Sequence, residues 1–413
     1  MRIERPTTIL ALLTALNFLN YVDRYLVAAV SPKFQEELHL SEFQTGLAIS
    51  AFMVGYFLTS PIFGALADRP GGARRLLMAL GVALWSAATA FSGLAHGATS
   101  LIVARIAVGV GEASYATIAP TIIDDLAPAG KKNRWLAIFY LATPVGSALG
   151  YLLGGFLEHH YGWRSAFFVA GGPGVLLAFT VLLLRDPEVH APKEHVQKGA
   201  LGVLLRSPIY VWCVAGYCAY TFAVGGFAAW APKFLYKVHQ MPLAEADFGF
   251  GLVAVLAGII GTVLGGTIAD RGLKDATDEE RVRAYLRYSA IVTVIGAPIA
   301  VLTIVAGSPT AFFAAIFLCE TALFASTSPI NAVILGAVPV TLRATAMAAS
   351  IFAIHALGDF LSPPLIGLVA DHASLRAGLW LLPVAIVACA ALWWVGSRAK
   401  LARAPEALNQ GQP

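Results

Sequence analysis

The stretch RIAVGVGEASYATIAPTIIDDL, residues 105–126, decides the fold together with the apolar residues 98–104 before it. A helix needs about 20 predominantly apolar residues to cross a hydrocarbon core of roughly 30 Å, and this stretch is long enough. It also carries Arg105 and Glu112, although a charge at the centre of a membrane helix costs about 2.5–3.5 kcal/mol on insertion scales. We therefore predict a membrane-spanning helix whose charged groups have a function.

Comparable apolar stretches recur along the whole chain. Of its 413 residues, 58% are hydrophobic and 13% are charged, whereas a soluble domain carries about 25% charged residues. We predict an all-α polytopic membrane protein. Its twelve expected spans are 7–30, 45–67, 75–96, 98–126, 133–157, 163–184, 207–232, 243–269, 284–306, 309–337, 343–370 and 375–397. The first is too long for a cleavable signal peptide and lacks an A-x-A site, so we expect it to be a spanning helix.

The connections between these spans show a charge asymmetry. Lys and Arg gather in the connections on one side, and the positive-inside rule then places both termini in the cytoplasm. The longest connection, 185–206, separates a six-helix half (1–184) from a second six-helix half with a short cytoplasmic tail (207–413). The net charge is +4, and the basic residues are distributed according to the predicted side of the membrane. This distribution indicates no nucleic-acid partner.

The two predicted halves repeat each other. GALADR at 64–69 is matched by GTIADR at 266–271, and Ala-Leu-Gly at 148–150 by the same triplet at 356–358. Chance similarity among Gly/Ala-rich helices is the alternative, but the matches keep their order. Six-helix repeats about an axis along the membrane normal imply a substrate site near the midplane between pseudo-symmetric halves.

Four charged residues in two expected spans are the first candidates for chemistry. Arg105 and Glu112 are seven residues apart on one helix face, and about 10 Å of axial rise keeps them from direct contact. Asp23 and Arg24 are adjacent and point about 100° apart. We hypothesise that Asp23 pairs with Arg105 and that Arg24 lies near Glu112.

Glu112 is the leading candidate for a proton carrier. Desolvation favours the protonated form of a buried carboxyl, and a nearby Arg⁺ opposes it. If the arginine moves away during transport, Glu112 binds a proton, and the proton leaves when the arginine returns. An arginine cannot itself carry the proton. The alternative is a fixed ion pair that locks helices one and four together.

The second half offers fewer ionisable groups. Glu320 lies 208 residues after Glu112, so the repeat predicts that the two face each other across a central cavity. Glu320 is either a cavity-wall or second titrating residue, or a glutamate that serves helix packing. His355 and Asp359 are four apart and can touch; a local hydrogen bond at a helix kinked by Pro363 is favoured over a proton relay.

Several of these motifs resemble one transporter family. GALADRPGGARR (64–75) resembles the signature loop between helices two and three of the major facilitator superfamily. The 105–126 stretch is similar to helix four of Spinster proteins. LNYVDRY (19–25), Glu320 and HALGDFLSPPLIGLVAD (355–371) match the same family.

The resemblance implies a twelve-helix rocker-switch transporter of amphipathic lipids or lipid-like molecules, such as lysophospholipids or sphingolipids. It implies a proton gradient as the energy source and no cofactor. The short loops and termini suggest a bacterial member in the inner membrane, and we expect a monomer.

The resemblance also implies gates at the signature loops, complete in the first half and degraded in the second. The candidate gating residues are Gly64, Asp68, Arg69, Arg74, Asp270 and Arg271. An apolar cavity with two arginines suits an anionic head and a hydrocarbon tail, so Arg24 and Arg105 are the expected head-group ligands. The other substrate-binding candidates are Glu320, Asn17, Asn20, Tyr21, Tyr115, Tyr217, Tyr220 and Trp230.

Other functions remain as alternatives. A proton-coupled transporter of small organic anions or drugs would share the fold and differ only in the shape of its cavity. The sequence shows no nucleophile–base pair or phosphate-cradling loop, so we do not expect an enzyme. The four cysteines lie inside apolar runs without the spacing of metal ligands, so we expect no metal site. A receptor or structural membrane protein fits poorly with charged residues in a repeated fold.

Overall fold

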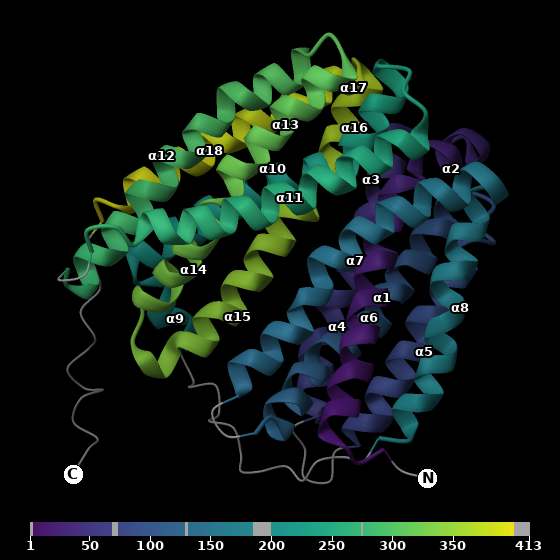
Figure 1. Ribbon diagram of the computed structural model, residues 1–413, viewed down its shortest axis with the longest axis horizontal. Helices are drawn as coiled ribbons and strands as arrows, with labels where there is room; N and C mark the ends of the chain where they lie inside the picture. The colour runs from purple at the N-terminus through teal and green to yellow at the C-terminus, as the bar shows by residue number, and fades with distance from the viewer. Residues whose placement is uncertain (1–2, 68–72, 129–130, 185–199, 274–275, 400–413) are drawn as a thin grey trace. The chain divides into compact units, whose positions relative to one another are not determined.

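The computed structural model describes residues 3–67, 73–128, 131–184, 200–273 and 276–399, which are almost entirely helical (Figure 1). In these residues, 11 helices are long and apolar enough to cross a membrane. The 24-residue helix α1 (Pro6–Ala29) is also long enough, but its polar residues lower its hydropathy. With α1, every one of the twelve predicted spans is helical, which confirms the predicted fold class.

The remaining helices follow the predicted spans closely. In the first half they are α2 (Ser31–Leu38), α3 (Glu42–Ser50), α4 (Phe52–Ala67), α5 (Arg74–Ser92), α6 (Ala98–Leu126), α7 (Lys132–Tyr161) and α8 (Trp163–Leu182). In the second half they are α9 (Ala200–Leu205), α10 (Pro208–Val238), α11 (Leu243–Ala269), α12 (Asp278–Val305), α13 (Pro309–Phe324), α14 (Thr327–Gly336), α15 (Arg343–Ile354), α16 (Ser362–His372), α17 (Leu375–Leu379) and α18 (Leu381–Gly396). The short helices α2 and α9 were not predicted, because neither is long enough to show a hydrophobic period. Residues 185–199 of the predicted linker lie outside the described residues.

Two spans of the second half are interrupted. The tenth breaks between α13 and α14, just before Pro329, and the eleventh contains a π-helix, His355–Asp359, between α15 and α16. Pro363 follows this segment at the start of α16, so the helix is interrupted where the kink was predicted. By contrast, α7 continues through Pro144.

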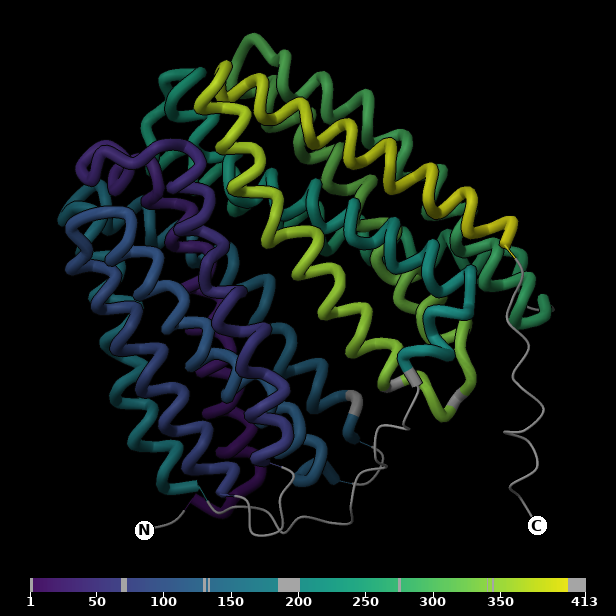
Figure 2. The backbone as a smooth tube through the Cα atoms, turned by 180° about the vertical axis from the view of Figure 1, so that it is seen from behind, coloured from purple at the N-terminus to yellow at the C-terminus, as the bar shows by residue number. Residues whose placement is uncertain are grey.

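The chain forms two compact units. Unit 1 comprises Met1–Lys193, Ala228–Val255 and Pro363–Gly378, and unit 2 comprises Glu194–Phe227, Leu256–Ser362 and Leu379–Pro413. In unit 1, α1 packs on α7, α4 packs on α6, and α5 packs on both α6 and α8 (Figure 1). In unit 2, α12 packs on α13, α14 and α18, and Figure 2 shows α18 running beside α12.

Unit 1 therefore includes two segments that follow residue 206 in the chain, 228–255 and 363–378. The Asp371 carboxylate of α16 accepts hydrogen bonds from the backbone N–H groups of Glu42 (2.7 Å) and Phe43 (2.9 Å), which begin α3. The buried Lys233 ammonium of α10 pairs with the Glu42 carboxylate. These contacts explain why the ends of α10, α11 and α16 group with the first half. The expected topological division at 185–206 stays a prediction.

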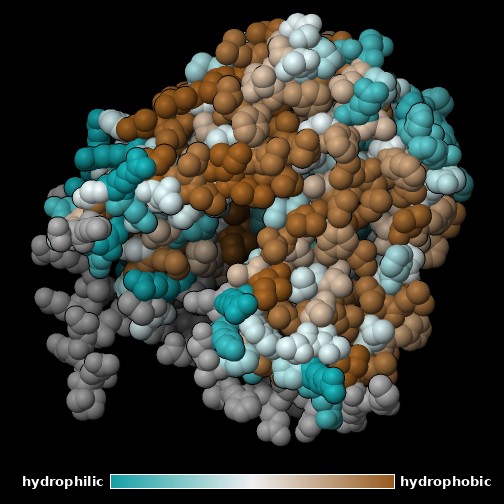
Figure 3. All heavy atoms as spheres, viewed as in Figure 1, coloured by the Kyte–Doolittle hydropathy of each residue, from teal (hydrophilic) through white to brown (hydrophobic). Residues whose placement is uncertain are grey.

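Large apolar side chains cover the outward faces of several helices. On α11, Leu252, Ile259 and Val263 are each at least half exposed, and Figure 3 shows hydrophobic residues over the face formed by α11 and α12. Exposed apolar surface of this extent is suited to lipid rather than water. The chain is an integral membrane protein.

Candidate functional site

The charged residues predicted in helices one and four meet inside unit 1. Close packing of α4 on α6 helps to bring them together, because Gly109 of α6 lies directly against the Phe52 carbonyl of α4 and leaves no room for a Cβ atom. The Phe52 ring then lies near both arginines, with guanidinium-to-centroid distances of 4.9 Å for Arg24 and 5.6 Å for Arg105. Such cation–π contacts help to hold a poorly hydrated arginine in place.

The deeper of two ion pairs joins α1 to α6. Nη1 of Arg105 lies 3.3 Å from Oδ1 of Asp23, and both side chains are almost fully buried. The other carboxylate oxygen of Asp23 accepts a hydrogen bond from the Thr89 hydroxyl of α5 at 2.7 Å. The predicted pairing of Asp23 with Arg105 is therefore present, and Thr89 is an additional partner that sequence reasoning missed.

The second ion pair contains the predicted proton carrier. Nε and Nη2 of Arg24 each lie 2.9 Å from Oε2 of Glu112. The Glu112 side chain is fully buried, whereas 17% of the Arg24 side chain is exposed. Oε1 of Glu112 is buried and has no hydrogen-bond partner. The predicted proximity of Arg24 and Glu112 is thus confirmed, and one carboxylate oxygen is left without a donor.

Aromatic side chains surround Arg24. Besides Phe52, the rings of Tyr21 and Tyr56 lie 5.2 and 5.5 Å from its guanidinium carbon. Phe52 and Tyr56 are four residues apart and share one face of α4, a spacing that marks neighbours on a helix. That spacing was visible in the sequence, but only the fold shows that this face meets Arg24.

Buried donors without partners lie beside these pairs in the same helices. Nε and Nη2 of Arg105 and Nδ2 of Asn20 are buried and have no hydrogen-bond partner. A buried donor left unpaired costs about 1–3 kcal/mol, so such a group marks either strain or a ligand site. Here the two guanidinium donors of Arg105 are cationic and suit an anion.

Other predicted substrate-wall residues are held by packing in this conformation. Asn17 donates to the Phe139 carbonyl at 3.0 Å, and the buried Tyr115 hydroxyl donates to the Leu13 carbonyl. The indole of Trp230 donates to the Pro363 carbonyl at 3.2 Å. Their assignment to a substrate wall stays a prediction, and their burial favours a packing role.

Three candidates of the second half, Tyr217, Tyr220 and Glu320, lie in unit 2. Glu320 is 2% exposed, and its Oε2 atom has no hydrogen-bond partner. Tyr220 shares a hydrogen bond of 3.1 Å with Thr327, and its ring lies 5.5 Å from that of Tyr217. The predicted arrangement of Glu320 facing Glu112 stays a prediction.

The His355–Asp359 pair forms as expected from its spacing. Nδ1 of His355 lies 2.9 Å from Oδ2 of Asp359 within the π-helix. Gly358 lets this segment pack closely on α10, because a Cβ atom there would collide with the Thr221 side chain. The pair is a local contact at an irregular helix, as the favoured interpretation held.

The gating candidates divide between described and undescribed residues. Asp68 and Arg69 lie outside the described residues. Arg74, at the start of α5, is buried and pairs with Asp125 near the end of α6 at 2.6 Å, and the pair bridges two helix ends.

The structure also describes three other gating candidates, Asp270, Arg271 and Gly64. In the second half, Asp270 accepts a hydrogen bond of 2.6 Å from the Tyr285 hydroxyl, and Arg271 is exposed. A Cβ atom at Gly64 would lie 3.6 Å from the Thr117 side chain. The gating roles themselves stay predictions.

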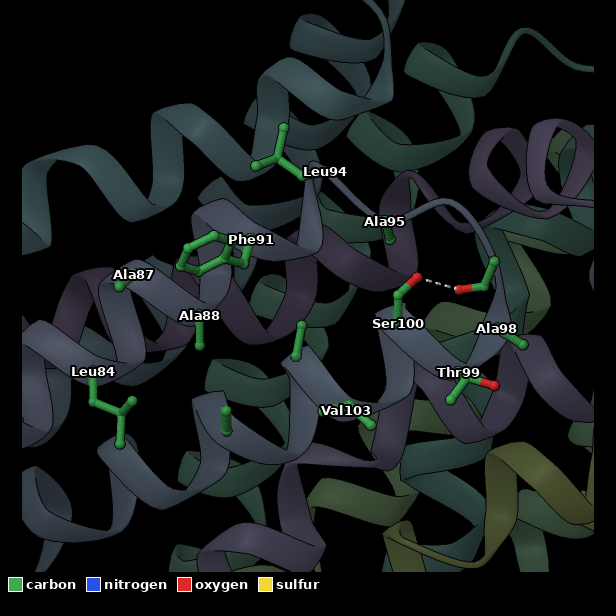
Figure 4. A pocket seen from close by; sticks show the side chains of 13 residues that line it. Leu84, Ala87, Ala88, Phe91, Leu94, Ala95, Ala98, Thr99, Ser100 and Val103 are labelled. Atoms are coloured by element: carbon green, nitrogen blue, oxygen red, sulfur yellow. Dashed lines mark hydrogen bonds between the residues drawn. The ribbon is translucent and has the colours of Figure 1, made fainter.

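A separate depression of about 850 Å³ lies between the end of α5 and the start of α6 (Figure 4). Phe91, Leu94 and Val103 line it, with Thr99 and Ser100 as polar neighbours, and no charged side chain contributes to its wall. Without a charged group it lacks the means to recognise a head group. The paired charges of α1 and α6 therefore remain the candidate site.

The described fold matches a known family. A family model of the Major Facilitator Superfamily matches residues 13–363. The helical spans with paired charges inside them, together with this match, define a membrane transporter of that superfamily.

Similar proteins narrow the family further. The chain is 33% identical to the Arabidopsis thaliana protein named "Probable sphingolipid transporter spinster homolog 2", over 95% of this chain and 87% of that protein. It is 35% identical to the human "Protein spinster homolog 1", over 89% of this chain and 74% of that protein. The chain belongs to the Spinster family.

Solved structures support the same fold. A bacterial homologue of the human lysosomal transporter Spinster, in an inward-facing and unoccupied conformation, superposes with a TM-score of 0.83 at 22% identity, covering 95% of this chain and 97% of that one. A D-xylose–proton symporter superposes with a TM-score of 0.71 at 16% identity, covering 94% and 97%. At these identities the likeness concerns the fold alone.

Proposed function

We propose that this protein is a proton-coupled secondary transporter that moves amphipathic, lipid-like molecules with an anionic head group by alternating access. The names of its relatives support a lipid-like substrate, since one is called a probable sphingolipid transporter. The apolar surroundings of Arg24 and Arg105 suit a molecule with a charged head and a hydrocarbon tail. The proton gradient supplies the energy, and no cofactor is required.

Asp23, Arg24, Arg105 and Glu112 form a group of charges that we call the α1–α6 cluster. The observation that carries the proposal is the unequal hydrogen bonding inside this cluster. Arg105 has two buried donors without acceptors, while Glu112 has a buried acceptor without a donor. A phosphate or carboxylate head group supplies oxygens that match a guanidinium. A proton can bind to Oε1 of Glu112, the carboxylate oxygen that has no donor. The same cluster thus accommodates both an anion and a proton.

Coupling follows from competition for Arg24. This guanidinium is the more exposed member of its pair, so an arriving anion can draw it away from Glu112. The buried carboxyl then loses its cation and binds a proton at Oε1, because an unpaired buried carboxylate is strongly disfavoured. When the substrate leaves, Arg24 returns and the proton is released.

The proposal also covers the membrane location of the protein and its gating. We place the protein in a bacterial inner membrane as a monomer, with both termini in the cytoplasm. Arg74 and Asp125 then lie at the cytoplasmic edge, where their pairing in one state and separation in another would bias a two-state equilibrium. Glu320 contributes to the substrate wall of the second half.

A second candidate function rests on the same donors. Two arginines recognise the anionic group and not the tail, so small organic anions or anionic drugs fit the charged part equally well. The two functions differ in whether a hydrocarbon chain is needed for transport.

The test uses protein reconstituted in liposomes with an imposed pH gradient. A labelled lysophospholipid and a labelled short-chain anion with the same head group are compared for wild type and Glu112→Gln. We expect gradient-driven movement of the lysophospholipid, which is lost in Glu112→Gln. Movement of the short-chain anion alone would replace the lipid assignment by the second candidate. A wild-type protein that moves neither under any gradient would contradict the proposal.

A further inference from the structure

A buried carboxyl far along the chain from the α1–α6 cluster has no role in the mechanism above. Asp247 lies in the second turn of α11, is 0% exposed, and belongs to unit 1. Both of its carboxyl oxygens are buried without a hydrogen-bond partner. A polar group buried in this way requires an explanation.

The carboxyl is seated against α7. Gly155 provides the space, since a Cβ atom at this position would lie 2.8 Å from Oδ2 of Asp247 and 2.9 Å from the Cα atom of Ala244. One helical turn away, the rings of Tyr151 in α7 and Phe250 in α11 pack at 5.3 Å. Asp247 is therefore enclosed in the contact between α7 and α11, not placed at a surface.

Among the residues that the structure describes, no cation is found to compensate the Asp247 carboxylate. Among the described residues, the charge that acts on Asp247 is Glu158 of α7, which has the same sign. Lys33 of α2 interacts with Glu158, and Lys233 of α10 pairs with Glu42. On α11 itself, the neighbouring Glu245 is exposed.

A buried ionised carboxylate with no protein donor and a like charge nearby is disfavoured by several kcal/mol. The neutral, protonated form is the one that fits the packed contact. If α7 and α11 separate, water reaches the carboxyl and favours its charged form. The two arrangements of this contact therefore differ in their affinity for a proton.

We propose that Asp247 is a second proton-binding site of the transporter, and that the contact between α7 and α11 closes only when Asp247 carries a proton. This inference rests on the proposed function. In the proposed orientation the contact lies at the outer side of the membrane. A proton bound to Asp247 then closes the α7–α11 contact at the outer side. Glu112 binds or releases its own proton according to the position of Arg24.

The test measures the contact itself and needs no substrate. Spin labels are placed at the exposed positions Tyr161 of α7 and Phe248 of α11, in a protein without its four cysteines. The Glu112→Gln background removes titration of the first proton site. Distances between the labels are then recorded across a pH series for the protein that retains Asp247, for Asp247→Asn and for the apolar replacement Asp247→Leu.

With Asp247 present, we expect the ratio of short to long distances to rise as pH falls, by up to roughly tenfold per pH unit for one proton. Both neutral replacements should give short distances at every pH. The control Glu245→Gln, on the same helix, should keep the pH dependence. The inference is overturned if both replacements keep that dependence, or if the contact does not respond to pH when Asp247 is present.

A further variant covers the case in which the replacements do not fold. Gly155→Ala leaves Asp247 intact but places a methyl group against its carboxyl, and we expect longer distances at every pH. Short distances with an unchanged pH response would contradict the packing described above. Failure of the proposed function would instead appear as absent lipid transport in wild type, with this distance response intact.

Discussion

The predicted repeat matches Glu112 with Glu320, and these two buried glutamates differ in their surroundings. Glu112 in α6 is 0% exposed and binds Arg24, next to the pair of Asp23 and Arg105. Glu320 in α13 is 2% exposed, and among the described residues no cation pairs with it. The two glutamates that the predicted repeat matches therefore differ in charge balance. In the proposed mechanism, coupling resides in the first half, where a cation can leave its glutamate.

The largest expected effect comes from breaking the deeper ion pair of the first half. Arg105→Met leaves the Asp23 carboxylate buried without a cation, and we expect a loss of about 3–5 kcal/mol in the free energy of unfolding. Denaturant unfolding in detergent measures it. Adding Asp23→Asn removes the orphaned charge and should restore most of the loss. If Arg105→Met alone matches wild type, the pair does not hold α1 to α6.

A smaller effect is expected from the aromatic ring shared by both arginines. Phe52→Leu keeps an apolar side chain but removes two cation–π contacts, so we expect a loss of about 1–2 kcal/mol. Phe91→Leu is the matched control, since Phe91 is exposed on α5 and should change stability by less than about 0.5 kcal/mol. Equal losses in the two variants would show that Phe52 acts through apolar packing alone.

The second half should respond in the opposite way. Glu320 has an unsatisfied oxygen and no cationic partner, so Glu320→Leu removes a buried polar group without leaving a charge unpaired. We expect the free energy of unfolding to stay within about 1 kcal/mol of wild type, or to increase. A loss comparable to that of Arg105→Met would mean that Glu320 has a strong partner and that the two halves are alike.

The smallest effect is expected at a surface pair, which provides the baseline for the buried ones. The Trp163 indole donates to the Glu37 carboxylate at 2.6 Å and Arg164 pairs with it at 2.8 Å. The hydrogen bond from Trp163, assisted by Arg164, lowers the pKa of Glu37 from its usual range. At half exposure such a pair contributes about 0.2–1 kcal/mol.

The sign of the pH dependence at Glu37 follows from the lowered pKa. The stabilisation is present above the pKa of an unfolded glutamate and is lost as pH falls through the lower pKa of the folded protein. Thermal unfolding of wild type and Glu37→Gln should therefore differ slightly at neutral pH and converge in acid. A difference that grows as pH falls would contradict this assignment.

Much of the fold could be predicted from the sequence, because a span long enough to cross a bilayer is a strong signal. The two ion pairs were also predictable. Spacing along a helix shows that Arg105 and Glu112 cannot satisfy each other, so each must use the adjacent charges Asp23 and Arg24. Intramembrane charges are few, which leaves few possible partners.

The partners supplied by other helices were harder to predict. Phe52 and Thr89 look like ordinary members of apolar helices, and their importance depends on which helix faces are in contact. Asp247 is visible as a charged residue in the expected span 243–269, but only the fold shows that both of its carboxyl oxygens are buried without a partner. The π-helix at His355–Asp359 likewise depends on close packing against α10. Of the expected substrate wall, Tyr115 and Trp230 proved buried and bonded to backbone, since tyrosine and tryptophan serve packing as readily as recognition.

The most direct test of the central claim is the movement of protons that accompanies substrate. Proteoliposomes with an internal pH-sensitive dye are given a lysophospholipid in the absence of a pH gradient, for wild type, Glu112→Gln and Glu320→Gln. We expect substrate-driven proton movement in wild type and in Glu320→Gln, and none in Glu112→Gln although it still binds substrate. Undiminished proton movement in Glu112→Gln, or its loss in Glu320→Gln alone, would contradict the assignment of coupling to the first half.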